Sequence, residues 1–422
     1  MILNIYIRLL LFFLLGATFF FGCSKEDDVS IVEVSPIISP TPPDASNTPS
    51  VITLEPLNAG NGGTITILGK HLMPKKEKPK VIINKKILEL LKASDDSVVA
   101  KIPKLLGSGK ISIMVAGTAY PGPEFIYNYK INVITIAGNG SVGQADGNAI
   151  NASFNCPRGI VADKNGDLFV ADCYNRLIRK FSATSQQVTS IFIPSGSIPA
   201  SGTGHSFYSP YNIALDSIKR ELYVTDFNTN ILKVNLTGGL SAIYTGESTT
   251  TGIGIAKNGY LYITNNIKGT IIKMNTTGGE VSNVVTGLVT PRNLIFDKSD
   301  NMFVSAYDAR SGSSGIFNID KADKPVLVKS DKEFNGWEIA VDTAGNFYEA
   351  DYFNNRIRLV EKNGRALTIA GNGVAADVDG NGINASFDGP QSIAIDAKGN
   401  LYVTTYNYEK ATGNKIRKII IE

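Results

Sequence analysis

Six copies of one short pattern, spread over the last two-thirds of the chain, constrain the fold more than any other feature. Each copy has an apolar run, an aspartate or an equivalent residue, a tight turn, and a second run rich in aromatic residues. The first copy is PRGIVADKNGDLFVAD from Pro157, and the others start at Pro210, Thr250, Pro291, Gly336 and Pro390. Aligned on their turns, the copies follow one another at 53, 40, 41, 45 and 54 residues. Paired short strands at this period are typical of propeller blades, so the sequence predicts a β-propeller with six blades.

The two ends of the repeat region predict how such a propeller closes. A further strand is expected after each of the first five copies, at 188–192, 241–245, 281–286, 325–329 and 367–370, whereas the sixth copy reaches Glu422 without one. The segment NVITIAG at 132–138 nearly repeats ALTIAG at 366–371. We therefore expect the early segment to supply the missing strand of the last blade, which would leave no free sheet edge between the first and last blades.

Family resemblances refine this prediction. The motif P-x-G-I-x-x-D…G-x-L-Y-V-A-D, followed by N-x-R-I-x-K as in 175–180 and 354–358, resembles the NHL repeat. Residues 49–130 contain short alternating runs separated by turns, which predicts a small β-sandwich. There VITLEPLNAGNGGTITILGKHL, IPKLLGSGKISIMVAG and FIYNY resemble an IPT/TIG domain, whose immunoglobulin-like fold usually spaces or docks another domain. The predicted fold class is all-β: a six-bladed NHL-like β-propeller at 131–422, preceded by a small immunoglobulin-like β-sandwich.

The first 48 residues predict an export signal followed by a flexible linker. Residues 1–22 have one arginine, an apolar run and a small Gly22, the layout of a secretory signal. Because Cys23 follows at once, FFGC resembles a bacterial lipoprotein signal with Cys23 as the lipid attachment site; a transmembrane anchor is the alternative. The SKEDD run resembles a signal for the outer face of some Gram-negative outer membranes, and the Pro- and Ser-rich remainder of 23–48 predicts a flexible linker. These features imply an outer-membrane lipoprotein that faces the cell exterior and touches the membrane only through its lipid.

Composition excludes several classes of function. The 41 basic and 38 acidic residues give a net charge of +3, and no basic cluster is interleaved with aromatics, which argues against a nucleic-acid partner. The chain has only two histidines, His71 and His205, too few for a His-ligated metal site. It also has no phosphate-binding glycine loop and no Gly-x-Ser-x-Gly elbow. These absences favour a non-catalytic protein without a cofactor.

The start of each innermost strand should lie at one rim of the central channel. By alignment these positions hold Arg158, Tyr211, Thr251, Arg292, Trp337 and Gln391, with Asn212, Asn293 and Glu338 beside them. Arginines, aromatic rings and an amide can stack on sugar faces and donate hydrogen bonds to hydroxyls or carboxylates. We therefore predict a ligand-binding rim made by Arg158, Tyr211, Arg292, Trp337 and Gln391. The alternative is a rim that binds nothing specific.

Two smaller features carry predictions of their own. Asp377, Asp379, Asn381 and Asp388 have the spacing of a calcium-binding loop, although turn formation explains the same residues. Cys156 and Cys173 flank the first hairpin and should lie almost opposite each other, which favours a disulfide outside the cell over two buried free thiols.

Taken together, the chain resembles the TIG-plus-NHL surface lipoproteins found beside glycan-uptake systems. The resemblance implies a non-catalytic lipoprotein that binds a glycan on the rim and assists a polysaccharide-uptake system. Two alternatives stay open at this point. One is a protein-docking scaffold in an outer-membrane complex, and the other is a propeller hydrolase or lyase.

Overall fold

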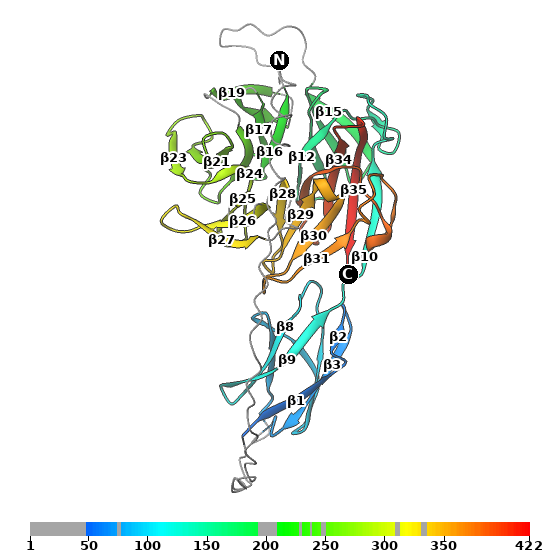
Figure 1. Ribbon diagram of the computed structural model, residues 1–422, viewed down its shortest axis with the longest axis vertical. Helices are drawn as coiled ribbons and strands as arrows, with labels where there is room; N and C mark the ends of the chain where they lie inside the picture. Colours follow the sequence, from blue (N-terminus) through cyan, green and yellow to red (C-terminus); the bar gives the residue numbers. More distant parts are fainter. Residues whose placement is uncertain are drawn as a thin grey trace, which may run out of the picture. The chain divides into compact units, whose positions relative to one another are not determined.

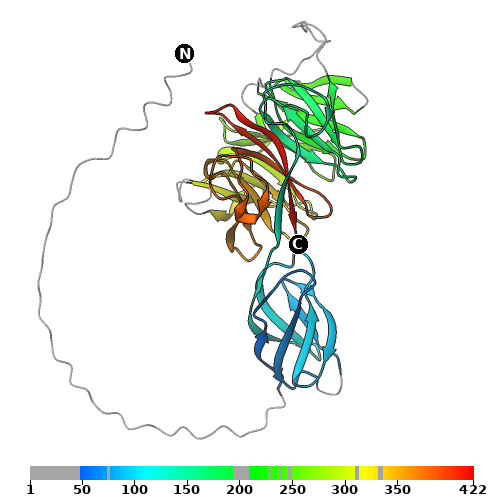
Figure 2. The same cartoon turned by 90° about the vertical axis from the view of Figure 1, so that its right-hand side faces the viewer.

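The computed structural model describes residues 48–73, 77–192, 209–227, 230–236, 239–245, 250–308, 313–330 and 336–422. All of them fall within the unit Asn47–Glu422. The predicted signal sequence, Cys23 and the predicted linker up to residue 47 lie outside the described residues. Within these residues, no helix has the length and apolar character needed to cross a bilayer. The predicted all-β fold class is confirmed: a small immunoglobulin-like sandwich precedes a six-bladed propeller (Figures 1 and 2).

The sandwich consists of two sheets with a shared core. One sheet has the order β1-β3-β7-β6 and the other β2-β9-β8-β4-β5. In β3, alternate residues point inward, so that Ile65 and Ile67 join Val98, Ile111 and Phe125 in one buried cluster. The strands are β1 (Ser50–Glu55), β2 (Asn58–Ala59), β3 (Thr64–Lys70), β4 (Lys80–Ile83), β5 (Lys86–Ile87), β6 (Glu89–Ala93), β7 (Ser97–Lys101), β8 (Gly109–Val115) and β9 (Thr118–Tyr127).

The propeller consists of six sheets whose strands follow one another from the central channel outward. Blade one has β12 (Pro157–Ala162), β13 (Leu168–Asp172), β14 (Leu177–Ser182) and β15 (Gln187–Phe192), with β11 (Gly147–Asn148) at its edge. Blade two has β16 (Pro210–Asp216), β17 (Glu221–Asp226), β18 (Asn230–Asn235) and β19 (Gly239–Thr245). Blade three has β20 (Thr250–Ile255), β21 (Leu261–Asn265), β22 (Thr270–Met274) and β23 (Ser282–Val285).

The remaining blades keep the same order. Blade four has β24 (Val289–Phe296), β25 (Met302–Asp308), β26 (Ser313–Ile319) and β27 (Pro325–Ser330). Blade five has β28 (Glu338–Val341), β29 (Phe347–Asp351), β30 (Arg356–Val360) and β31 (Ala366–Ala370), with the short 3-10 helix η2 (Tyr352–Asn354). Blade six has β33 (Pro390–Ile395), β34 (Leu401–Asn407) and β35 (Thr412–Ile421), and a loop with β32 (Gly380–Asn381) and η3 (Gly382–Asn384) precedes it.

The predicted closure is confirmed. Strand β10 (Ile131–Ala137) pairs antiparallel with β35, from Ile131 opposite Ile421 to Ala137 opposite Ile416. It therefore supplies the outer strand of blade six, and both views show it beside β35 (Figures 1 and 2). The C-terminal part of β35, from Ile416 to Ile421, thereby gains a sheet partner, and the ring of blades is closed.

The hydrophobic cores lie between neighbouring blades. For example, Phe169 and Ile178 of blade one pack with Ile213, Val224 and Leu232 of blade two. The two inner strands of each blade are buried on both faces, because a blade has a neighbour on each side. This explains the continuous apolar runs in the repeats, such as the five buried residues of LFVAD in β13.

Tight turns connect each inner strand to the next and mark one end of the channel. After β33, Asp396 Oδ1 accepts hydrogen bonds from the amides of Lys398 and Asn400 at 2.8 and 2.9 Å. Asp163 and Asp342 make the same turn-closing bonds, so these aspartates of the repeat have a structural role. We call this end, where the inner strands finish, the lower mouth, and the end where they begin the upper mouth.

Candidate ligand-binding site

Four of the five predicted rim residues lie together at the upper mouth. The Arg158 guanidinium lies 3.8 Å above the centre of the Tyr211 ring and 5.4 Å from the centre of the Trp337 ring. Arg292 lies 5.3 Å from the same Trp337 ring. These four residues come from blades one, two, four and five, so only the closed ring brings them together. The predicted clustering therefore holds, although Arg158 is only 6% exposed and lies deeper than a surface rim.

Gln391 and Thr251 have structural partners. Gln391 Nε2 donates to the carbonyl of Tyr406 at 2.7 Å, and its Oε1 accepts a weak bond from Arg158 at 3.4 Å. Thr251 Oγ1 bonds to Thr264 Oγ1 at 3.0 Å and to the carbonyl of Pro291 at 3.1 Å. Both side chains are almost fully buried. Gln391 thus supports Arg158 from below, and Thr251 ties blade three to blade four.

Aromatic rings from the loops after the second strands enlarge this cluster, and they lie outside the predicted rim. Tyr352, Phe353 and Tyr408 lie 5.0, 6.1 and 6.2 Å from the Trp337 ring. Phe353 is 56% exposed, so the cluster reaches the surface. We name Arg158, Tyr211, Arg292, Trp337, Tyr352, Phe353 and Tyr408 the aromatic–arginine cluster.

A signal for these rings is present in the repeats. An aromatic residue follows the aspartate that ends the second strand in three blades, as Tyr174 after Asp172, Phe227 after Asp226, and Tyr352 with Phe353 after Asp351. Because these loops lie at the upper mouth, the repeated aromatic position predicts rings around it. Phe227 indeed stacks on Tyr211, with ring centres 5.9 Å apart.

A buried carboxyl group lies below the cluster, at the start of β28. Glu338 Oε1 accepts a hydrogen bond from Asn212 Nδ2 at 2.9 Å, and Oε2 accepts one from the Ser392 hydroxyl. Burial raises the pKa of Glu338 to about 7, although the nearby Arg158 and the Ser392 bond act in the opposite direction. Below it the channel is narrow and lined mainly by isoleucine, leucine and alanine, with a volume of about 260 Å³. Glu338 therefore separates the upper mouth from an apolar channel.

The predicted disulfide is absent from the structure, which holds Cys156 and Cys173 as buried free thiols. The two residues are adjacent as expected, because the Cys173 amide donates to the Cys156 carbonyl at 3.2 Å. Each sulfur atom also lies near a hydroxyl group: Cys156 Sγ is 3.7 Å from the Tyr408 hydroxyl, and Cys173 Sγ is 2.9 Å from that of Ser209. A hydrogen bond from Cys156 lowers the pKa of Cys173 to about 7. Burial raises that of Cys156.

In the segment predicted to bind calcium, an arginine neutralises two of the aspartates. The fully buried Arg417 donates to Asp377 Oδ1 at 2.8 Å and to Asp379 Oδ1 at 2.9 Å. The Asp388 amide donates to Asp377 Oδ1 at 3.1 Å, and its carboxylate accepts from Asn407. Asn381 pairs with Asn132 in the sheet. No group of three or more His, Cys, Asp or Glu side chains in the described ranges could hold a metal.

Blade one contains a similar arrangement, in which one of the two acids lies on a strand and not in the loop. There the buried Arg179 donates to Asp146 at 2.7 Å, in the loop, and to Asp172 at 2.8 Å, at the end of β13. Thr405 of blade six occupies the strand position that Asp172 has in blade one, and its hydroxyl donates to Asp377 at 2.8 Å. Each arginine thus bonds to two carboxylates. Both partners of Arg417 come from the loop, whereas Arg179 has one partner in the loop and one on the strand. Phe154 and Phe387 lie under these guanidinium groups and are fully buried, so they fix the two loops to the core.

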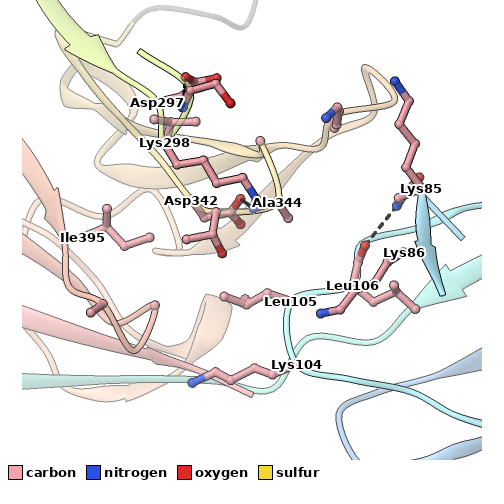
Figure 3. A pocket seen from close by; sticks show the side chains of 18 of the residues that line it. Lys85, Lys86, Lys104, Leu105, Leu106, Asp297, Lys298, Asp342, Ala344 and Ile395 are labelled. Atoms are coloured by element: carbon pink, nitrogen blue, oxygen red, sulfur yellow. Dashed lines mark hydrogen bonds between the residues drawn. The ribbon is translucent and has the colours of Figure 1, made fainter. Parts of the chain in front are cut away.

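The lower mouth has a cavity of different chemistry (Figure 3). Its volume is about 610 Å³, and its lining includes six lysines: Lys85, Lys86, Lys104, Lys298, Lys362 and Lys398. The carboxylates of Asp297, Asp342 and Asp396 also line it, but they accept hydrogen bonds within their own turns. We name this cavity the lysine cleft. It has no aromatic ring on which a sugar could stack.

The comparisons with known proteins agree with the fold. Residues 154–181 match the NHL repeat family model. No curated relative matches the chain. A structural genomics protein of unknown function from Bacteroides thetaiotaomicron VPI-5482 is similar in structure, with a TM-score of 0.59 and 20% identity. So are two auxiliary nutrient binding proteins, one from that organism (TM-score 0.55) and one from Bacteroides ovatus ATCC 8483 (TM-score 0.50), both at 17% identity. Each likeness covers 89% of this chain and 98% of the other, and at these identities it establishes the fold alone.

Proposed function

We propose that the protein is a non-catalytic capture protein that binds a saccharide at the aromatic–arginine cluster. In this proposal Cys23 carries a lipid that holds the chain on the outer face of the outer membrane. Residues 49–130, as an IPT/TIG domain, space the propeller from the surface, and the captured saccharide is passed to a polysaccharide-uptake system. The two solved structures named auxiliary nutrient binding proteins share this architecture and favour a role of the same kind.

One observation supports the proposal above the others: aromatic rings and hydrogen-bond donors lie together at the mouth of a rigid ring of blades. Trp337, Tyr352 and Tyr408 are partly buried, so their orientations are fixed before a ligand arrives. Fixed rings lose little conformational entropy on binding, and their faces suit the C–H groups of a pyranose. Arg158 and Arg292 supply donors for the hydroxyl or acidic groups around it.

Two observations bear on the alternatives. The exposed rings of Tyr174, Phe227 and Phe353 would also suit a protein partner, because aromatic side chains are common at the centres of protein interfaces. A hydrolase or lyase would need an acid or base, and Glu338 has a pKa of about 7. Both of its oxygens, however, already bond to Asn212 and Ser392, and the side chain is buried. Saccharide capture is therefore the function that the site favours.

A fluorescence titration tests the proposal. Trp337 is the only tryptophan, so its emission reports on the cluster alone. We expect a saturable change when the mature chain, with Cys23→Ser, is titrated with oligosaccharides of one class. Tyr352→Ala or Tyr408→Ala should weaken binding about fivefold to tenfold through the loss of one stacking surface.

Tyr260→Ala is the matched control, because Tyr260 lies in the turn after β20, at the lower mouth. It should leave the affinity unchanged. If no saccharide changes the emission of the folded chain, capture at this cluster is wrong and protein docking becomes the better proposal.

A further inference from the structure

The aromatic–arginine cluster holds positive charge that the protein itself does not neutralise. Arg158 is 6% exposed, yet no carboxylate in the described part of the chain forms an ion pair with it. Among the described residues, its only hydrogen bond as a side-chain donor is the 3.4 Å bond to the neutral Gln391, and its Nε has no partner. Two other buried arginines of the propeller have counter-charges: Arg179 and Arg417 each bond to two carboxylates. Arg158 thus lacks the counter-charge that a buried arginine usually has.

Two further donors lie beside it and are also poorly satisfied. Arg292 makes one long bond, 3.5 Å, to the carbonyl of Gly336. Trp337 Nε1 is buried and has no hydrogen-bond partner. The two guanidinium carbons lie 5.4 and 5.3 Å from the Trp337 ring centre, so both arginines lie close to the same ring. Buried donors without acceptors are rare in folded proteins, because each one costs the hydrogen bonds it made to water.

The nearest acid does not supply the missing charge. Glu338 lies below the cluster, and its two oxygens face Asn212 and Ser392. The other titratable groups near Arg158 are the phenols of Tyr211 and Tyr408 and the thiols of Cys156 and Cys173. Burial raises the pKa of both phenols and of Cys156, so these three groups stay neutral. The Cys173 thiol, whose pKa is lowered to about 7, lies against the Ser209 hydroxyl and supplies at most one partial charge for two arginines. The cluster is therefore cationic, and it is rich in donors and poor in acceptors.

These observations deepen the proposed function and rest on it. We propose that the captured saccharide is acidic, and that its carboxylate or sulfate group is bound by Arg158, Arg292 and Trp337 Nε1 while a sugar ring lies on the neighbouring aromatic faces. Arginine suits either group, because its planar fork donates two parallel hydrogen bonds to an oxyanion. In a partly desolvated site such charge-assisted bonds are stronger than bonds to a neutral hydroxyl. The occupant is thus a saccharide with one anionic group per bound residue, as in a uronate or a sulfated galactan.

Calorimetry with three matched probes tests this inference: oligogalacturonides, sulfated galactan oligosaccharides and neutral galacto-oligosaccharides of the same length. At about 0.15 M salt, at least one acidic probe should bind more than tenfold more tightly than the neutral probe. Arg158→Gln and Arg292→Gln should each weaken that acidic probe roughly tenfold to hundredfold and leave the neutral probe within about twofold. Which acidic probe binds distinguishes a carboxylate from a sulfate.

The lysine cleft provides the control for non-specific attraction (Figure 3). Lys298→Gln and Lys398→Gln remove the same single charge from the lower mouth, and both residues are exposed. They should leave the affinity for the acidic probe unchanged. If they weaken it and the arginine variants do not, the acidic saccharide binds at the wrong end of the channel and the inference is overturned.

The outcomes also separate this inference from the proposed function. Equal or tighter binding of the neutral probe, with loss in Tyr352→Ala, would retain saccharide capture and refute its acidic specificity. No binding of any probe would refute both. Circular dichroism and the unfolding midpoint establish that each variant is folded, and Arg292→Gln alone is decisive if Arg158→Gln fails to fold.

Discussion

Replacing Arg417 with methionine is expected to lower the free energy of unfolding by about 3–5 kcal/mol, the usual cost of leaving a buried charge without its partner. Arg417 is fully buried and bonds to Asp377, Asp379 and the carbonyl of Ser386. Methionine fills a similar volume but neutralises nothing, and Asp377 is itself only 1% exposed. The loop before β33 would also lose its attachment to β35. Equilibrium unfolding in guanidinium, followed by far-UV circular dichroism, measures the change.

Two further variants make this prediction specific. Lys418→Met changes the next residue of the same strand and removes the same charge, but Lys418 is partly exposed and should cost less than about 1 kcal/mol. Adding Asp377→Asn to Arg417→Met removes the buried carboxylate that has lost its partner. The double variant should therefore recover part of the lost free energy of unfolding. If Arg417→Met is no more destabilising than Lys418→Met, the buried ion pairs do not stabilise the loop as described. Calcium should not change the stability of the wild-type protein.

Replacing Glu338 with glutamine should make the protein more stable at pH 8 and leave it nearly unchanged at pH 4.5. Burial raises the pKa of Glu338 from 4.5 to about 7. Between these values the folded protein keeps a proton that the unfolded chain releases, so the contribution of Glu338 to stability falls as pH rises through this window. Above pH 7 the carboxylate is charged in both states. Burial of this charge then lowers the free energy of unfolding by about 3 kcal/mol, from the size of the pKa shift. Glutamine keeps an acceptor for Asn212 without the charge.

The measured quantity is the difference in unfolding free energy between variant and wild type at several pH values from 4.5 to 8. Taking the difference cancels other raised groups, such as Asp172, whose pKa burial raises to about 6. Glu409→Gln is the control, because Glu409 is exposed and should give a flat difference. A flat difference for Glu338→Gln as well would mean that Glu338 titrates at the same pH in the folded and the unfolded protein. Burial would then not raise the pKa of Glu338.

The sequence predicts the fold well because the propeller repeats its own pattern. The spacing of the six turns locates every inner strand, and the likeness of 132–138 to 366–371 predicts the closing pair that β10 and β35 form. The same alignment locates Arg158, Tyr211, Arg292 and Trp337 at one mouth, since equivalent positions in a ring face the same axis. Periodicity therefore predicts which positions meet.

Contacts between different segments could not be predicted in this way. The spacing of Asp377, Asp379 and Asp388 resembles a calcium loop, but the cation that neutralises the first two is Arg417, on a strand some 40 residues later. Cys156 and Cys173 are adjacent as expected, but the hydroxyls near their sulfur atoms come from Tyr408 and Ser209 in other blades. Tyr352, Phe353 and Tyr408 lie outside the aligned strands, so the rim prediction contained only part of the cluster. In each case a side chain from a distant segment determines the chemistry.

The closing pair also determines when the ring can be completed. Strand β10 emerges before any blade during synthesis or export, and β35 is the last strand of the chain. Blade six must therefore wait for the whole polypeptide, and a contact between such distant segments forms slowly. Until then the apolar strand INVITIA has no partner and is a template for pairing with other chains. The sandwich is joined directly to β10 and needs nothing that follows it, so it can fold first. Closure of the propeller is consequently coupled to the emergence of β35.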